Sequence, residues 1–446
     1  MAPQLICGGF FCGWLSASPG SDGLAVVAAR AAGRGPACRA ADVTGPARIE
    51  PGDRVVITGA LGFIGSAVAR AVQARGAKIV AVVEPGADDR NLQRIGAERA
   101  VADIRDIAAV RAACAGARFV FHLAAIYRFW ARDPRIFYDV NVGGTLNVLS
   151  AARAAGCQRL VFTSTVGVLG LGGTRQGKPA DETCYADIAD LSGPYKRSKF
   201  TAEHEVLRAC AEGLDLCIVL PTFPLGPGDI APTPTGKLVL DFLNGKMPAF
   251  TDTALNVIHV DDLGLGHLAA LERGRRGRSY ILGGENLPMR AILRTLADYS
   301  GLPMPRLQIP PGLAVTAGVA SSLIQGRLLR REPRVPLDAA RMSTTRMIFS
   351  DQRARTEIGH TSRPAREAIK ESARWFAGNG YVTARRRAAI RPSGSISDER
   401  TCESGWFQFE RSSLREGRRR ERVRLQRTCR SWNRGLSGSH PFRALR

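Results

Sequence analysis

The sequence lacks any long uninterrupted apolar run. Its longest uncharged apolar stretch extends from about Leu313 to Ile324, which is shorter than the roughly 20 residues that a membrane-spanning helix needs. We expect this stretch to form a helix that is buried or faces a partner; the alternative left open is a short helix that rests peripherally on a membrane surface. The apolar N-terminus has no basic flank before it, which argues against a secretory signal.

Paired cysteines are missing as well. The ten cysteines are scattered, without CxxC pairs or the spacing of metal ligands, so we expect free thiols in a reducing cytoplasm and no metal site. The remaining composition is typical of a soluble α/β protein whose length allows two or three domains.

Acidic residues are too few to balance the basic ones, and the formal net charge is +23. Residues 383–446 contain 17 Arg, no Lys and 6 acidic residues. We interpret 384–446 as an Arg-rich disordered extension; the alternative, an RNA-binding arm, has few interleaved aromatics to support it, so nucleic acid is not the expected partner. Residues 1–50 are interpreted as a second extension of low order, which places the folded domain at about 53–383.

Short apolar runs alternate with helical patterns along residues 54–221. This alternation predicts βαβ units, and hence an α/β fold with a doubly wound parallel sheet of the Rossmann kind. After Pro221 the pattern becomes irregular, and we expect a small C-terminal substrate lobe over about 222–383. Residues 256–274 should return to the sheet region, and the chain from Ser279 onward should pack in the lobe. The predicted strands are 55–58, 78–83, 99–103, 119–125, 159–165 and 215–221.

A glycine-rich turn follows the first predicted strand. Gly59, Gly62 and Gly65 are spaced as GxxGxxG between an apolar run and a helical pattern. Such a turn lets a diphosphate approach backbone N–H groups at a helix N-terminus, where the helix dipole favours negative charge. The alternative is a tight strand-to-helix turn that binds nothing.

Two acidic residues follow the next predicted strands. Glu84 comes 19 residues after Gly65, the distance at which a carboxylate reaches the adenosine ribose, so NAD is favoured over NADP. Arg90 lies close enough in sequence to accommodate a 2′-phosphate, which keeps NADP open. Asp103 is placed to accept a hydrogen bond from the adenine amino group, to cap a helix, or to do both. His122 is interpreted as a core or strand-end residue.

Tyr195 and Lys199 carry the strongest chemical signal. A YxxxK pair on a helix places both side chains on one face. The ammonium of Lys199, together with the positive charge of the nicotinamide, should lower the phenol pKa of Tyr195, so that the phenol exchanges a proton with a substrate hydroxyl or carbonyl. Lys199 should also hold the nicotinamide ribose. A hydroxyl from the preceding strand end should bond the reacting oxygen; we choose Thr165, with Ser164 second.

Several sequence blocks together resemble a known superfamily. TGALGFIG, HLAA, NVGGT, TSTVGVLG, YKRSK and HVDD are similar to those of extended short-chain dehydrogenases/reductases. AAIYRFWARDP, GPGDIAPTPTGKLVLDFLNGKMPAF and YILGGEN narrow the resemblance to the hopanoid-associated sugar epimerases, which are close to dihydroflavonol 4-reductase-like proteins. The resemblance covers about residues 54–383 and neither terminal extension.

The resemblance implies a catalytic Ser/Thr, Tyr and Lys, here Thr165, Tyr195 and Lys199, with Asn141 in a supporting role. It also implies a set of residues around the cofactor that comprises Gly59, Gly62, Phe63, Ile64, Gly65, Glu84, Asp103, Ile104, Ala124, Asn141, Tyr195, Lys199 and Pro221. Two positions depart from many relatives, because Thr165 replaces Ser and Glu84 replaces Arg. The first change keeps the hydroxyl, and the second argues against NADP.

The expected function is that of an NAD(P)-dependent sugar or sugar-nucleotide epimerase or oxidoreductase linked to hopanoid biosynthesis. One alternative is a dihydroflavonol- or hydroxysteroid-like ketone reductase, which apolar residues expected in the cleft would suit. Another is a dinucleotide-binding sensor without turnover, against which the intact Tyr and Lys count. The expected partner is a small-molecule substrate, and a homodimer is left open. The apolar cleft residues are Tyr127, Phe129, Trp130, Phe223, Leu225 and Phe250.

Overall fold

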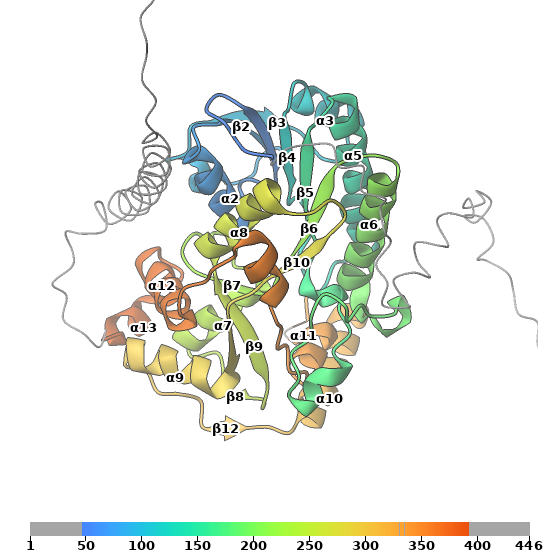
Figure 1. Ribbon diagram of the computed structural model, residues 1–446. Coiled ribbons are helices and arrows are strands. Elements are labelled where there is room, and N and C mark those ends of the chain that lie inside the picture. Colours follow the sequence, from blue (N-terminus) through green and yellow to red (C-terminus); the bar gives the residue numbers. More distant parts are fainter. Residues whose placement is uncertain (1–46, 330, 334, 392–446) are drawn as a thin grey trace, which may run out of the picture. The chain divides into compact units, whose positions relative to one another are not determined.

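The computed structural model describes residues 47–391 apart from 330 and 334, and its main element is a parallel sheet of seven strands (Figure 1). The strand order is β10-β6-β5-β4-β1-β2-β3, so the α/β doubly wound fold predicted from the alternation is confirmed. All six predicted strands form. Their bounds are β1 Arg54–Thr58, β2 Lys78–Val83, β3 Ala97–Val101, β4 Phe119–His122, β5 Arg159–Thr163, β6 Leu216–Pro221 and, for the seventh, β10 Ser279–Leu282.

Helices cover both faces of this sheet. Along β1, Val55 and Ile57 pack into one apolar cluster with α2 (Phe63–Gln73) and α8 (Val260–Arg273). Val56 packs into the other cluster, with α3 (Ile107–Cys114), α5 (Thr145–Ala154) and α6 (Gly193–Ala211). Successive strand residues point to opposite faces, which explains why the central strands are apolar at nearly every position, whereas the edge strand β3 carries exposed charged residues.

The lobe is built on a three-stranded sheet of order β11-β9-β7. Its strands are β7 Phe223–Leu225, β9 Ala254–His259 and β11 Glu285–Pro288, and β8 Ala249–Phe250 pairs separately with β12 Leu307–Gln308. Helices α7 Pro234–Leu243, α9 Met289–Ser300 and α12 Ala365–Gly378 pack together on this part, and α10 Pro311–Ser321, a π-helical turn Ser322–Leu328 and α11 Leu337–Met342 follow. Two further α-helices are short: α4 Arg135–Tyr138, which continues into the π-helical turn Asp139–Gly144, and α13 Ala384–Ala389. The other short elements are helical turns at Arg90–Leu92, Val166–Val168, Gly172–Gln176, Ile188–Asp190 and Ala354–Ile358.

Two segments after Pro221 were assigned to the wrong part of the fold. The strand expected to return to the main sheet, Ala254–His259, lies in the lobe as β9, and only the α8 that follows it packs on the main sheet. The strand expected in the lobe, Ser279–Leu282, pairs with β6 as the seventh strand. Both strands are short apolar runs, so their residues fit either sheet and only the tertiary pairing decides between them.

The folded part also extends beyond both of the boundaries expected from the sequence, at about 53 and 383. Ala47 and Ile49 are 1% and 2% exposed and belong to the cluster under α2. At the other end, Arg386 donates from Nε to the Leu243 carbonyl at 3.0 Å, and the Arg391 amide donates to the Ser300 carbonyl at 2.9 Å. The expected disorder of the rest concerns residues 1–46 and 392–446, which lie outside the described part of the chain.

We predict that deleting residues 1–46 and 392–446 leaves the thermal midpoint within about 2 °C of the full chain, because neither segment has a periodic apolar face. A longer deletion that also removes 47–50 and 384–391 should lower the midpoint by about 4 °C or more, since it uncovers the pocket that Ile49 fills. Differential scanning calorimetry measures both. Equal midpoints for the two truncations would contradict the packing of these ends.

Candidate active site

The glycine turn brings two backbone segments into contact. Gly59 has a φ of +72°, and a Cβ there would lie 2.8 Å from the Ala124 nitrogen after β4. A Cβ on Gly65 would lie 2.0 Å from the Gly59 carbonyl oxygen. Gly62 is exposed and directly precedes α2 as its N-cap residue, and no side chain caps this end of the helix. The turn therefore leaves N–H groups of a helix N-terminus open to an anion, which fits the diphosphate of a dinucleotide.

The other predicted cofactor residues lie at the same edge of the sheet. Thr58 is in register with His122 of β4 and with Val82 of β2, so the chain after each strand emerges beside the glycine turn. Glu84 is exposed directly after β2, and Pro221 ends β6. The remaining members are distributed around this edge: Phe63 and Ile64 open α2, Asp103 and Ile104 follow β3, and Ala124 follows β4.

Asp103 and Arg90 have partners within the chain. Arg105 donates from Nε and Nη2 to the Asp103 carboxylate, with the Nη2 contact at 2.5 Å. Asp106, rather than Asp103, caps α3 by accepting from two backbone amides, so the capping role proposed for Asp103 is wrong. Arg90 is paired with Asp88 at 2.6 Å. A phosphate would have to compete with that carboxylate for Arg90.

A buried chain of hydrogen bonds joins β1 to the helix that follows β4. The Thr145 hydroxyl donates its single proton to the Asn141 carbonyl at 2.7 Å. In its contact with His122 Nε2, at 2.9 Å, Thr145 is therefore the acceptor and the ring nitrogen is the donor. His122 Nδ1 then accepts from Thr58 at 2.7 Å. Burial, with the charge of Lys199 as a smaller cause, lowers the pKa of His122 to about 3, which keeps the ring neutral. His122 is therefore a core residue, as expected.

Asn141 extends this chain to the helix of the YxxxK pair. Its Oδ1 accepts from the Ile126 amide at 2.8 Å, and its Nδ2 donates to Ser198 Oγ at 2.9 Å. Ser198 in turn donates to the Tyr195 carbonyl at 2.9 Å. Asn141 is 1% exposed. It thus ties the loop after β4 to the first turns of α6, which is a supporting position.

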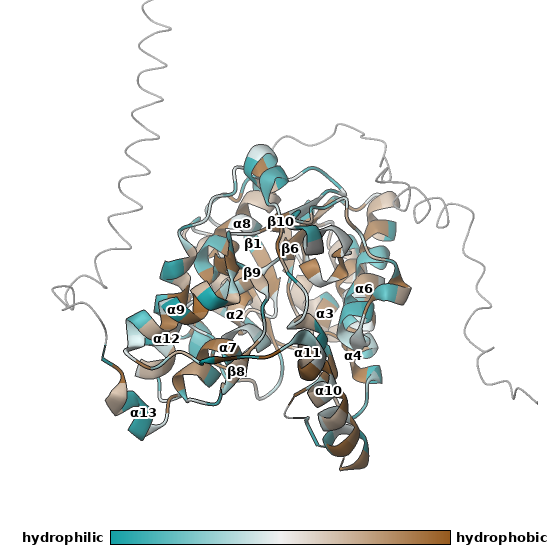
Figure 2. Ribbon diagram, turned by 90° about the horizontal axis from the view of Figure 1, so that it is seen from below, coloured by the Kyte–Doolittle hydropathy of each residue, from teal (hydrophilic) through white to brown (hydrophobic). Residues whose placement is uncertain are grey.

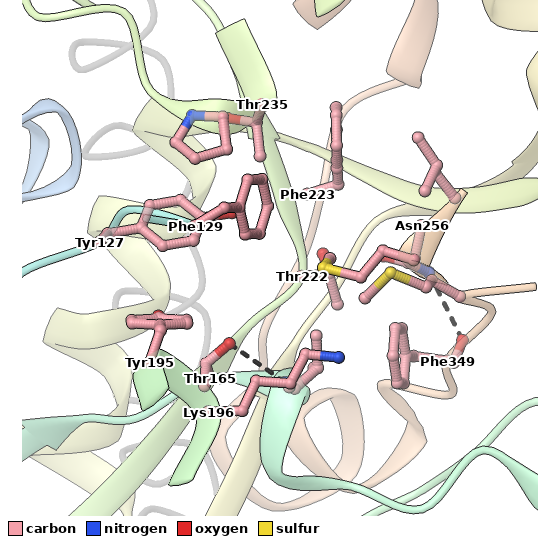
Figure 3. A pocket seen from close by; sticks show the side chains of 16 residues that line it. Tyr127, Phe129, Thr165, Tyr195, Lys196, Thr222, Phe223, Thr235, Asn256 and Phe349 are labelled. Carbon is pink, nitrogen blue, oxygen red and sulfur yellow. Dashed lines mark hydrogen bonds between the residues drawn. The ribbon is translucent and has the colours of Figure 1, made fainter. Parts of the chain in front are cut away.

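Tyr195 and Thr165 face the same pocket (Figure 3). The Tyr195 ring packs against the ring of Tyr127, with 4.9 Å between the ring centroids. The Tyr195 hydroxyl forms a hydrogen bond with the Thr165 side chain. Thr165 Oγ1 also accepts from the Gly167 amide at 3.1 Å. Ser164, the second choice for this role, instead donates to Glu203 at 2.5 Å. The structure therefore brings Thr165, not Ser164, to the phenol.

Lys199 is buried beneath the pocket. Its Nζ donates to the Thr163 carbonyl at 2.7 Å and lies 4.4 Å from the centroid of the Phe162 ring. Burial lowers its pKa to about 7, and Glu203 opposes this shift. For Tyr195, desolvation raises the pKa above the ordinary range and the hydrogen bond to Thr165 acts in the opposite direction. The lowering of the phenol pKa that the sequence predicts depends also on the positive charge of the nicotinamide, and it stays a prediction.

The pocket is mainly apolar and draws on both parts of the fold. Figure 3 shows Tyr127 and Phe129 near Tyr195, with Phe223 and Phe349 contributed by other elements. Of the apolar residues that the sequence analysis expects in the cleft, Tyr127, Phe129 and Phe223 line the pocket. Leu225 and Phe250 are buried in the core instead. The lining comprises Tyr127, Phe129, Thr165, Val166, Gly167, Tyr195, Lys196, Thr222, Phe223, Pro234, Thr235, Leu255, Asn256, Met342, Met347 and Phe349.

Of the lining residues that the lobe contributes, the sequence pointed to Phe223 and missed the others. Thr222 had a usable signal, since it follows the end of β6 at the ligand-binding edge of the sheet. Leu255, Met342, Met347 and Phe349 had none. They come from β9, the end of α11 and the chain that bridges to β9, and no local pattern marks a residue that faces a pocket from another segment.

The pKa of Lys199 leads to a prediction about stability. Between pH 7 and the ordinary lysine pKa of about 10.4, the unfolded chain binds a proton at Lys199 that the folded chain does not. Raising the pH through this window therefore stabilises the folded state. From pH 7 to 9, wild-type protein should gain up to about 1 kcal/mol per pH unit relative to Lys199→Met. Urea unfolding without cofactor measures the difference, and a pH-independent difference would contradict it.

Comparison with known proteins agrees with this geometry. A family profile described as the NAD dependent epimerase/dehydratase family matches residues 55–283. A Synechocystis sp. protein assigned as a dihydroflavonol 4-reductase is 37% identical over 334 residues, which cover 74% of this chain and 96% of that protein. Sterol demethylase protein B of Methylococcus capsulatus is 33% identical, with 73% and 99% covered.

Among solved structures, that of gox2253 is 40% identical with a TM-score of 0.67, and the match covers 74% of this chain and all of that one. The match to the family profile spans β1 to the end of β10 and includes the glycine turn, Thr165 and the YxxxK pair. The chain therefore belongs to the NAD dependent epimerase/dehydratase family of extended short-chain dehydrogenases/reductases, and it is an NAD-dependent oxidoreductase or epimerase.

Proposed function

We propose that the protein interconverts a secondary alcohol and a ketone on a bulky, mainly apolar substrate. The observation that carries this proposal is the lining of the pocket beside Tyr195 and Thr165. Aromatic and aliphatic side chains, two methionines among them, make up ten of its sixteen lining residues, and Lys196 is the one charged residue among them. Such a surface gains free energy by covering apolar rings or chains, whereas a diphosphate would need several cationic or N–H donors.

The residues of the site have distinct roles in this proposal. Tyr195 donates its phenolic proton to the substrate oxygen in reduction, and the raised phenol pKa keeps that proton in place. Thr165, bonded to the same phenol, holds the substrate oxygen. Lys199 supports the strand end through the Thr163 carbonyl and faces the region where the nicotinamide ribose would lie. Bound NAD supplies the hydride donor or acceptor.

The relatives support this substrate class. The names of the two proteins compared above refer to a dihydroflavonol and a sterol, which are both compact ring systems. A hopanoid-derived alcohol or ketone would be another member of the same class. The hopanoid link stays a prediction of the sequence resemblance.

The second candidate is epimerisation of a sugar or sugar-nucleotide. It is favoured by the description of the family and by polar residues on one side of the pocket, Thr222, Thr235 and Asn256. The retention of NAD separates the two activities, because an epimerase regenerates its cofactor within one turnover and a reductase exchanges it. Mass spectrometry of the nucleotide that copurifies, followed by product analysis with sugar nucleotides, would identify an epimerase.

We predict that Tyr195→Phe lowers turnover of an apolar ketone by about 10²- to 10⁴-fold while cofactor affinity stays within about twofold, because the change removes the proton donor and keeps the ring. Thr165→Val should also lower the rate, and Thr165→Ser should retain it. Oxidation of NADH by a panel of bulky ketones measures turnover, and fluorescence titration measures binding. Leu265→Ala, at an exposed position of α8, is the control.

Turnover at the wild-type rate by Tyr195→Phe would refute the assignment of this tyrosine as proton donor. Cofactor binding by wild-type protein, with no conversion of any ketone or sugar nucleotide, would instead favour a dinucleotide sensor. The first outcome concerns the residue and the second concerns the function, so they are distinguishable.

We also predict that NADH binds more tightly than NADPH by roughly 5- to 150-fold, corresponding to about 1 to 3 kcal/mol. Glu84 is exposed at the end of β2, where its carboxylate would repel a 2′-phosphate. Glu84→Arg should shift the preference toward NADPH, whereas Glu98→Arg, on the neighbouring β3, should leave it unchanged. Titration of both nucleotides against the three proteins tests this, and tighter NADPH binding by wild type would contradict it.

A further inference from the structure

The segment from Pro311 to Leu329, here termed the apolar segment, exposes an unusual number of large apolar side chains. It consists of α10 and the π-helical turn Ser322–Leu328, and it ends at Leu329. Leu323 is 54% exposed, Ile324 56% and Leu328 78%. Leu313, Val319 and Leu329 are exposed as well. In Figure 2 this region is coloured as hydrophobic and projects from the lobe beside α11.

The sequence of α10 is apolar on all sides, which is typical of a helix that is fully surrounded by apolar material. Only Ala314 and Gly318 of α10 are buried. A Cβ on Gly318 would lie 2.5 Å from the Ala340 Cβ of α11, so α10 packs closely on α11 along this narrow line. Among the rest, Val315 and Ser321 are partly exposed and the other residues of the helix are exposed, and exposed apolar areas of this kind mark interaction sites.

The charges near the apolar segment favour an anionic partner. The segment itself contains a single charged residue, the exposed Arg327. Residues 327–334 contain four arginines and one glutamate, and that glutamate, Glu332, lies 3.6 Å from Lys237. Apolar side chains followed by a group of arginines are the pattern of a helix that lies in the interface of an anionic bilayer. No helix among residues 47–391 is long and apolar enough to cross a membrane.

The apolar segment is also connected to the candidate active site. A Cβ on Gly326 would lie 3.3 Å from Nε1 of Trp130, and the same loop carries Phe129 and Tyr127 into the pocket. On the other side, α10 packs on α11, whose last residue, Met342, lines the pocket. The wall of the pocket is therefore continuous with the structures that support the apolar segment.

We propose that the apolar segment docks the protein on an anionic lipid bilayer, so that the pocket takes an apolar substrate from the lipid phase. The large side chains from Leu313 to Leu329 would enter the interface, and Arg327 with the exposed Arg331 would lie among the lipid phosphates. The proposal of docking depends only on the exposed apolar and basic side chains of this surface. The delivery of substrate rests in addition on the proposed function.

The test is flotation of the full chain with vesicles of phosphatidylglycerol and phosphatidylcholine, and with vesicles of phosphatidylcholine alone. Wild-type protein should bind the anionic vesicles at least about tenfold better. Leu323→Glu combined with Leu328→Glu should reduce that binding by at least about tenfold, because it places two charges in the interface. Leu265→Glu is the matched control, since Leu265 is 52% exposed on α8, and it should bind as wild type does.

The Arg-rich residues 392–446 could attract anionic vesicles by charge alone, so the comparison is repeated in high salt, which screens that attraction. Binding by apolar insertion should persist there and remain sensitive to the double substitution. Unchanged thermal midpoints and NAD affinities exclude misfolding of the variants. Arg327→Glu should weaken binding to the anionic vesicles and leave the weak binding to phosphatidylcholine unaltered.

Equal vesicle binding by wild type and the double variant would overturn the proposal, as would the absence of binding by wild type. A wild-type dimer that the same double substitution converts to monomer in light scattering, without vesicles, would show that a second copy covers the segment and would also overturn it. If docking holds and no apolar ketone is converted, the proposed function fails while the docking surface stands.

Discussion

The close approach of backbone at the glycine turn is the constraint on which the site depends. The turn after β1 lies against the start of the chain after β4, and a Cβ on Gly59 or Gly65 would overlap backbone atoms. The same tight packing continues where α2 crosses α8, because a Cβ on Gly264 would lie 2.7 Å from backbone atoms of Ala67. Arg70 and Asp261, 2.6 Å apart, add an ion pair at this crossing. Side chains are thus excluded from the place where a dinucleotide would approach.

A buried polar chain then fixes the proton donor relative to that turn. Thr58, His122 and Thr145 connect β1 to the helix after β4, and Asn141 connects that helix to α6. Every link is satisfied among buried side chains, where an unpaired group would be costly. A continuous series of hydrogen bonds therefore joins the strand before the glycine turn to the helix that carries Tyr195, although about 130 residues separate the turn and the tyrosine in sequence.

The lobe supplies part of the wall of the pocket beside Tyr195. Its wall is formed by β9, α11 and the loop after β4, and it is mainly apolar. The same loop and α11 support the apolar segment, so a pocket suited to apolar molecules and an exposed surface suited to lipid are neighbours in the fold. This arrangement would spare an apolar substrate passage through water, where its transfer is unfavourable.

The sequence by itself determined the parallel sheet, the glycine turn and the YxxxK pair, because each depends on spacing within one strand or helix. It also indicated a hydroxyl at the end of β5. Only the tertiary structure decided that Thr165 rather than Ser164 faces the phenol, since Glu203, from α6, engages Ser164. It alone placed β10 in the main sheet and β9 in the lobe. Such choices depend on contacts between segments far apart in the chain, and short apolar runs fit several partners equally well.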